Sequence, residues 1–115
     1  MSDVATLYAE ADELKLDGDL EGAISKLQEV LAIDDSHVLS HLALAVVYGR
    51  VGKHELACQH GEKACQIEPE EPFNFTAMSV TYQRAWQGTQ VQDYIAKAED
   101  AMARAHMLQG TGPRH

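Results

Sequence analysis

The sequence has no long apolar run and opens without an export signal. No stretch approaches the roughly 18 to 20 uninterrupted apolar residues that cross a bilayer. Residues 1–10 (MSDVATLYAE) contain acidic residues and lack the basic segment and apolar run of a secretory signal. We therefore expect a soluble, cytoplasmic protein with no membrane partner. At 115 residues, the chain is expected to form one domain.

Cysteine is scarce. Cys58 and Cys65 are the two in the chain, too few for a disulfide framework, and both are expected to be reduced thiols. His37 and His41 stand four residues apart, as do His54 and Cys58, and such a spacing can hold a metal. No HExxH frame accompanies either pair. Packing or incidental placement is favoured over a metal site, and we predict no metal and no cofactor.

Basic residues are also few: nine lysines and arginines stand against 18 acidic residues, for a net charge of −9. Nucleic acids and anionic membranes need a basic surface, so neither is an expected partner. The excess is concentrated in residues 1–36, which hold ten acidic and two basic side chains. This end is either a solvated acidic surface, which we favour, or a docking site for a basic segment of a partner. A head-to-tail contact between copies is a third reading.

Catalytic motifs are missing as well. The sequence has no glycine-rich phosphate loop and no serine in a nucleophile elbow. Most acidic residues stand at expected helix starts or at exposed positions, where they favour the helix dipole and solubility. We therefore predict that the protein is not an enzyme.

What the chain does contain is an internal repeat of 34 residues. A small residue where two helices cross lets their backbones approach, and large apolar residues three or four positions away fill the grooves. The repeat therefore predicts helical hairpins. The three series that carry it are the small residues Ala11, Ala45 and Ser79, the large residues Leu14, Tyr48 and Tyr82, and a third set of Leu7, His41 and Phe75.

The breaks between helices are marked by turn residues. Gly18 and Gly52 are suited to the positive φ that ends the first helix of a unit, and Asp19 can cap the second. Between units, Ser36 is expected to be an N-cap and Pro72 to take a first helical position. No segment has the pattern of a strand.

On these residues the sequence resembles the tetratricopeptide repeat family, whose pattern also has a period of 34 residues. Two departures in the second unit are His41 at the usual aromatic position and Gly61 at the usual phenylalanine. The resemblance implies an all-α, right-handed superhelical stack of three hairpins, with repeats of about 4–37, 38–71 and 72–109 in one domain, 1–109. The second unit matches best, with Leu44, Ala45, Tyr48, Gly52, Ala57, Ala64 and Pro69 in the family spacing.

The third unit fits only with about seven residues inserted around 86–92, after which Ala98, Met102 and Ala105 fall into the repeat. Seven residues are close to two helical turns and preserve the buried face. Thr89 with Gln92 has capping-box spacing, which predicts a long final helix from about 90 to 109 that caps the stack. Residues 110–115 are expected to be a flexible tail.

The single tryptophan stands at this insertion. Trp86 either anchors the long last helix, which we favour, or marks an exposed binding edge. Tyr82 is four residues earlier, a spacing that would allow the two rings to pack together, and it is expected to be a core residue.

In the family, the first helix of each unit lines a concave groove that holds a peptide or a helix, so the resemblance implies a protein-interaction module. Its carboxylate clamp needs Lys and Asn where this chain has Tyr8, Asp12, Leu42 and Val46, so we do not expect an acidic chaperone tail. An apolar or amphipathic segment fits better. The expected groove residues are Ala5, Tyr8, Asp12, Lys15, Leu39, Leu42, Val46, Arg50, Phe73, Thr76, Val80, Gln83 and Arg84.

Two functions remain open from the sequence. The first is an adaptor or scaffold whose groove binds a peptide or helical segment, with a basic end beside Asp12 and an acidic end near Arg50 and Arg84. The second is a self-associating module, in which residues such as Leu42 and Val46 pack against a second copy to form a homodimer or serve as core.

Overall fold

The computed structural model describes residues 3–110, which form six α-helices and contain no strand. This confirms the predicted all-α class. The helices are α1 (Val4–Leu16), α2 (Leu20–Ile33), α3 (Val38–Arg50), α4 (His54–Ile67), α5 (Pro72–Thr89) and α6 (Asp93–Gln109).

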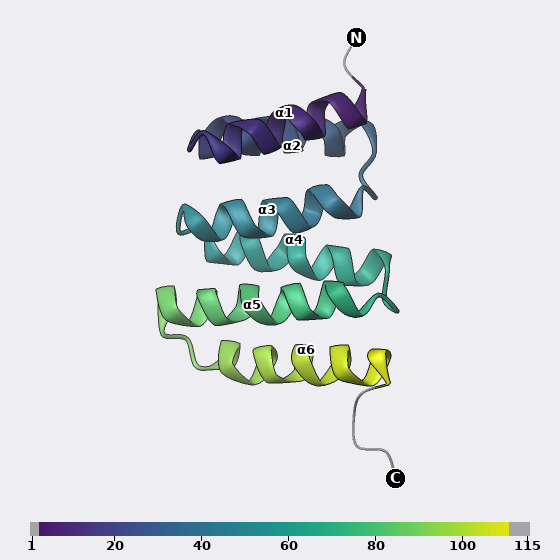
Figure 1. Ribbon diagram of the computed structural model, residues 1–115. Coiled ribbons are helices and arrows are strands. Elements are labelled where there is room, and N and C mark those ends of the chain that lie inside the picture. The colour runs from purple at the N-terminus through teal and green to yellow at the C-terminus, as the bar shows by residue number, and fades with distance from the viewer. Residues whose placement is uncertain (1–2, 111–115) are drawn as a thin grey trace.

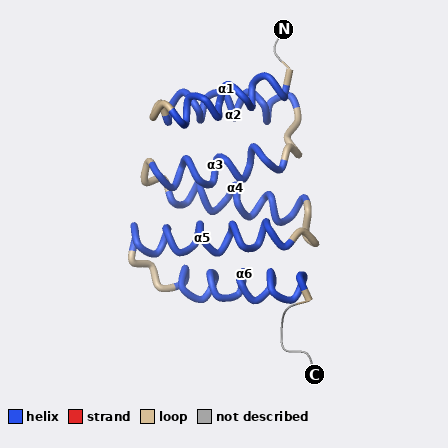
Figure 2. Tube along the Cα trace, viewed as in Figure 1, coloured by secondary structure: helices blue, strands red, loops and turns tan. Residues whose placement is uncertain are grey.

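Consecutive helices pair into three hairpins that stack in chain order, from α1 and α2 at one end to α6 at the other (Figures 1 and 2). The stack measures 53 × 29 × 21 Å. Each hairpin packs on the next through the contacts of α2 with α3 and of α4 with α5, and α3 also contacts α5 directly. The three-hairpin stack is confirmed, while its right-handed sense stays a prediction.

Glycine makes the turn inside the first two hairpins, as predicted. Gly18 and Gly52 have φ values of +89° and +84°, a conformation that L side chains rarely adopt. The carboxylate of Asp19 then accepts a hydrogen bond of 2.9 Å from the backbone N–H of Gly22 and caps α2.

Between hairpins the structure corrects one predicted cap. Ser36 is not the N-cap of α3. Its hydroxyl and backbone N–H both donate to Oδ1 of Asp34, which holds the serine in the connecting turn. His37 is the cap, and its Nδ1 accepts from the backbone N–H of Ser40. Pro72 does take the first position of α5.

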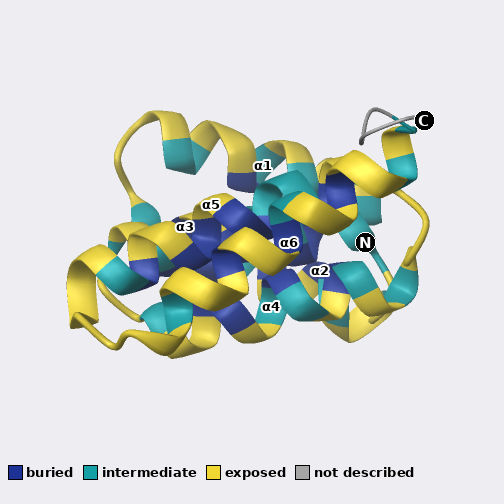
Figure 3. Ribbon diagram, turned by 90° about the horizontal axis from the view of Figure 1, so that it is seen from below, coloured by how far each residue is buried: buried dark blue, intermediate teal, exposed yellow. Residues whose placement is uncertain are grey.

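The core lies along the seams between helices, where buried residues follow the 34-residue repeat (Figure 3). Ala11, Ala45 and Ser79 are 2%, 4% and 1% exposed, so the small series does sit where helices cross closely. The larger buried side chains around them include Leu27 and Leu44. Burial of these apolar surfaces supplies the main favourable free energy of the stack.

The third hairpin is longer, and the structure divides the inserted residues between its two helices. α5 has 18 residues against 13 in α1 and α3, which accounts for five. Ala98 is the sixth residue of α6, whereas its counterparts Ala23 and Ala57 are fourth in their helices, which accounts for the other two. The sum is the predicted seven.

The predicted start of the last helix at residue 90 is wrong. Gln90 has φ +63° and terminates α5, and α6 begins at Asp93. The expected capping box does not form, because Thr89 is the last residue of α5 and its hydroxyl donates to the carbonyl of Ala85. Gln92 makes no side-chain cap.

The added end of α5 reaches the neighbouring hairpin. A Cβ placed on Gly88 would collide with the imidazole of His54, the first residue of α4. Glycine at this position therefore allows the extended helix to lie against α4.

Gly110 ends α6 with φ +68°, while the rest of the expected tail, 111–115, lies outside the described residues. Among the helices of residues 3–110, none has the length and apolar character needed to span a bilayer.

Candidate functional site

The residues predicted to line a groove all lie on α1, α3 and α5, the first helices of the three hairpins. None of them is buried. Tyr8, Lys15, Leu42 and Thr76 are half-buried, and the other nine are exposed. None of them belongs to the buried core, and Tyr8 packs against its edge.

Four of these residues form what we name the apolar patch: Leu39 and Val46 on α3, with Phe73 and Val80 on α5. Their exposed fractions are 54%, 36%, 61% and 40%. Residues seven apart lie on one face of a helix, so each helix contributes one pair to one face. The two pairs are exactly one repeat of 34 residues apart on helices that contact each other. On α1, the corresponding positions hold Ala5 and Asp12, so the patch is confined to the second and third hairpins.

Two arginines stand beyond the patch, one turn after the valines. Arg50 and Arg84 are again separated by one repeat, and both are exposed. The Cδ of Arg84 lies close to Gly49 of α3, so the arginine extends from α5 toward α3. Within residues 3–110 neither guanidinium forms an ion pair, which leaves a positive rim at this end of the patch.

The first hairpin continues the same face with different chemistry. The carboxylate of Asp12 and the ammonium of Lys15 are 3.4 Å apart, and both groups are partly solvated, so this pair adds little to stability. Tyr8 lies beside His37, with 5.6 Å between ring centroids. Burial, followed by the charge of Asp12, raises the pKa of the Tyr8 hydroxyl, which stays protonated and able to donate.

Three other predicted groove residues are either half-buried or hydrogen-bonded within their own helix. The Thr76 hydroxyl donates to the carbonyl of Pro72, one turn earlier, and the Gln83 amide donates to the hydroxyl of Ser79. Leu42 is half-buried.

Thiol and imidazole groups lie mainly between helices. Burial first, then the charge of Glu62, raises the pKa of Cys58 and of Cys65 to about 11, so both thiols are protonated at neutral pH. His41 and His60 face each other, with 3.0 Å between their Nδ1 atoms. In the part of the chain that the structure describes, no three histidine, cysteine or acidic residues come together as metal ligands would.

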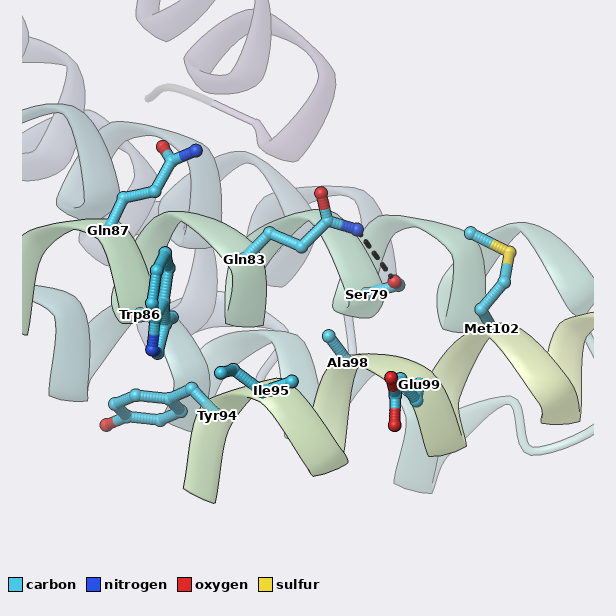
Figure 4. A pocket seen from close by; sticks show the side chains of 9 residues that line it. All are labelled: Ser79, Gln83, Trp86, Gln87, Tyr94, Ile95, Ala98, Glu99 and Met102. Atoms are coloured by element: carbon cyan, nitrogen blue, oxygen red, sulfur yellow. Dashed lines mark hydrogen bonds between the residues drawn. The ribbon is translucent and has the colours of Figure 1, made fainter. Parts of the chain in front are cut away.

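Sequence reasoning missed a pocket between α5 and α6, which we name the end pocket (Figure 4). Its volume is about 480 Å³. The signal in the sequence is Trp86, which we expect to anchor the last helix. In the structure the ring forms part of the pocket wall, together with Tyr94 and Ile95 of α6. Tyr82 is buried, as expected of a core residue, and it stacks on Tyr94 with 6.0 Å between ring centroids. The pocket is lined by Ser79, Gln83, Trp86, Gln87, Tyr94, Ile95, Ala98, Glu99 and Met102.

A stack of three helical hairpins with a 34-residue repeat has the tetratricopeptide-type fold. No family model matches the sequence, and no curated protein matches it.

Solved structures share this fold. MamA is 19% identical with a TM-score of 0.78, and the match covers 94% of this chain and 59% of MamA. The type III secretion translocator chaperone SycD of Yersinia enterocolitica is 20% identical with a TM-score of 0.78, covering 96% of this chain and 78% of SycD. A chain of the CopN–Scc3 complex is 14% identical with a TM-score of 0.77. The match covers 96% of this protein and 61% of the chain from the complex. This chain thus spans about 60% of the length of MamA.

Proposed function

We propose that this protein is a non-catalytic interaction module, an adaptor or scaffold that binds a segment of another protein on the face formed by α1, α3 and α5. The apolar patch is the observation that carries this proposal. Four large apolar side chains exposed on adjacent helices need an explanation in a soluble protein, and contiguous patches of this kind are typical of interaction sites.

The patch and its rim also indicate the chemistry of the ligand. Apolar side chains would pack on Leu39, Val46, Phe73 and Val80, and an acidic end would meet Arg50 and Arg84. At the other end, Asp12 offers a carboxylate to a basic residue, in competition with Lys15. We therefore infer an amphipathic peptide or helix, acidic toward the arginines and basic toward the first hairpin.

The fold comparisons support this proposal only in its general form. SycD is a chaperone, and the CopN–Scc3 structure is a complex, so related stacks occur in proteins that act on other proteins. A non-catalytic role also fits the thiols, since Cys58 and Cys65 have raised pKa values and lack the thiolate that nucleophilic catalysis needs.

Selection from a displayed peptide library tests the proposal. The wild-type protein is expected to select peptides that combine apolar and acidic residues. The double variant Val46→Glu, Val80→Glu should weaken the binding of these peptides by at least about tenfold, because it places negative charge on the apolar surface next to the arginine rim.

A matched control adds the same charge elsewhere. Gln59→Glu with Gln66→Glu alters two exposed positions on α4 and should leave peptide affinity unchanged. Equal binding to the patch variant and the control would overturn the proposal. The rival reading, in which a second copy covers the patch, predicts instead that the wild-type protein is a dimer that the patch variant separates.

A further inference from the structure

The end pocket occupies the place that, in the first hairpin, is filled by the helix of the following hairpin. The corresponding space in the first hairpin has a volume of about 10 Å³, against about 480 Å³ in the third. Ala43 and Val47 of α3 line the small space together with residues of α1 and α2, whereas residues of α5 and α6 alone line the end pocket. Four residues of the end pocket, Ser79, Gln83, Ala98 and Met102, correspond in the repeat to Ala11, Lys15, Ala23 and Leu27, which line the small space.

The chain itself shows what fills such a place. Ala43 is followed four residues later by Val47, and one repeat further on, Ala77 is followed by Thr81. Thr81 is 7% exposed, and its hydroxyl donates to the carbonyl of Ala77, which leaves its methyl group for packing. The occupant is in both cases an α-helix with a small residue and a β-branched residue four positions apart.

One wall residue distinguishes the end pocket from its filled counterparts. With the insertion taken into account, Glu99 corresponds to Ile24 and Cys58, which are 6% and 5% exposed. Ile24 packs in the same core cluster as Leu44, which follows the small residue Ala43 of the incoming helix. In the same way, Cys58 packs in one cluster with Met78, which follows Ala77. Burying the Glu99 carboxylate there is costly unless the incoming helix brings a positive charge at this position.

A second copy does not offer such a helix at its amino-terminal end. On α1, the positions that correspond to Ala43 and Val47 are Ala9 and Glu13, and Glu10 stands where Leu44 does. Docking α1 in the pocket would bring these two carboxylates toward Glu99 and the apolar wall. A head-to-tail polymer of copies is therefore disfavoured by charge.

We propose that the end pocket binds an α-helix of another protein, seated as α3 is seated beside α1 and α2. The helix carries a small residue, a lysine or arginine directly after it, and a valine or threonine four positions after the small residue. The basic residue pairs with Glu99. This site shares no residue with the apolar patch and does not depend on the function proposed for it.

The probe is a synthetic peptide with the sequence of residues 37–51 and the change Leu44→Arg. A crosslink between positions 41 and 45, which are about one turn apart, holds the peptide helical. These positions are chosen because they lie on the side of the helix opposite 43 and 47, which enter the pocket. The peptide has no tryptophan, so the emission of Trp86, the single tryptophan of the chain and part of the pocket wall, reports binding. A second peptide with Leu44→Glu is the matched control.

The arginine peptide is expected to shift the emission of Trp86 and to bind about tenfold more tightly than the glutamate peptide. The variant Glu99→Lys, at an exposed position, should reverse this order while its circular dichroism stays that of the wild type. Val46→Glu in the apolar patch should leave both affinities unchanged, which separates this site from the proposed groove.

Three results would overturn the proposal. The first is a Trp86 emission that neither peptide changes, and the second is equal affinity for the two peptides or an order that Glu99→Lys does not reverse. The third is a light-scattering mass of two chains that falls to one in Ile95→Glu, because the pocket would then be occupied by a second copy.

Discussion

At the scale of single residues, the contact between His41 and His60 links the two helices of the second hairpin. The Nε2–H of His41 donates to the carbonyl of Asp35 at 2.8 Å, so in the neutral ring its Nδ1 is an acceptor. The Nδ1–H of His60 then donates to it across 3.0 Å. Tyr48 stacks on His60 with 5.6 Å between centroids, and its hydroxyl accepts from the amide of Gln28. His41 therefore replaces the usual aromatic residue of the repeat with a ring that is also hydrogen-bonded.

This pair predicts a loss of stability in mild acid. Burial, and then the neighbouring His41, lowers the pKa of His60 in the folded state. The unfolded chain therefore takes up a proton first, near pH 6.5, so the stabilisation present above that pH is lost as the pH falls through the folded pKa. Thermal unfolding should show a lower Tm at pH 5.5 than at pH 7.5.

The variant His60→Gln keeps a donor toward His41 and should reduce this pH dependence. The carboxylates of Asp3 and Asp34 do not contribute to the change in Tm between pH 5.5 and pH 7.5. Backbone and side-chain hydrogen bonds lower their pKa values, so their contributions to stability are lost only at more acidic pH. A Tm in His60→Gln that falls as steeply as in the wild type would contradict the assignment.

At the scale of elements, α4 and α5 pack with complementary side-chain volumes, a missing side chain on α4 and a large one on α5. Gly61 stands where the repeat family has phenylalanine, and sequence reasoning alone does not explain this glycine. In the structure, a Cβ on Gly61 would lie 2.7 Å from Sδ of Met78, which is 3% exposed. The methionine of α5 therefore fills the volume that the missing side chain of α4 leaves open.

A double-mutant cycle tests this complementarity. Gly61→Phe should cost about 1–3 kcal/mol in the free energy of unfolding because it overpacks the seam. Met78→Ala should cost about 2–5 kcal/mol because it leaves a cavity. The double variant should recover at least about 1 kcal/mol relative to the sum, measured by denaturant unfolding. Strict additivity would show that the two residues do not share this volume.

The helices that follow the repeat were predictable, and those that depart from it were less so. Gly18, Gly52 and Pro72 marked their turns and starts because their backbone chemistry is local. The end of α5 was not predicted correctly, since Thr89 can either cap a new helix or bond back to Ala85, and the local sequence does not distinguish these outcomes.

At the scale of the whole molecule, the repeat predicted which helices carry the candidate binding face but not how the stack ends. The resemblance to the repeat family implied the positions of Leu39, Val46, Phe73 and Val80 on the groove-lining helices, and all four are exposed. The end pocket is recognised only by comparing its lining with that of the smaller space beside Ala43 and Val47, which is a three-dimensional comparison.

The charge distribution separates the two ends of the stack. Residues 1–36 carry −8 and residues 72–115 carry +1. A partner that engages the apolar patch and the arginine rim therefore approaches the less acidic part of the molecule, where an acidic segment meets less repulsion.

The central claim is that the apolar patch is free for a partner and is not covered by a second copy. Light scattering of the wild-type protein from micromolar to near-millimolar concentration measures this directly. The proposed function predicts the mass of one chain throughout. A mass of two chains that returns to one in Val46→Glu would contradict it and would identify the patch as a homodimer interface.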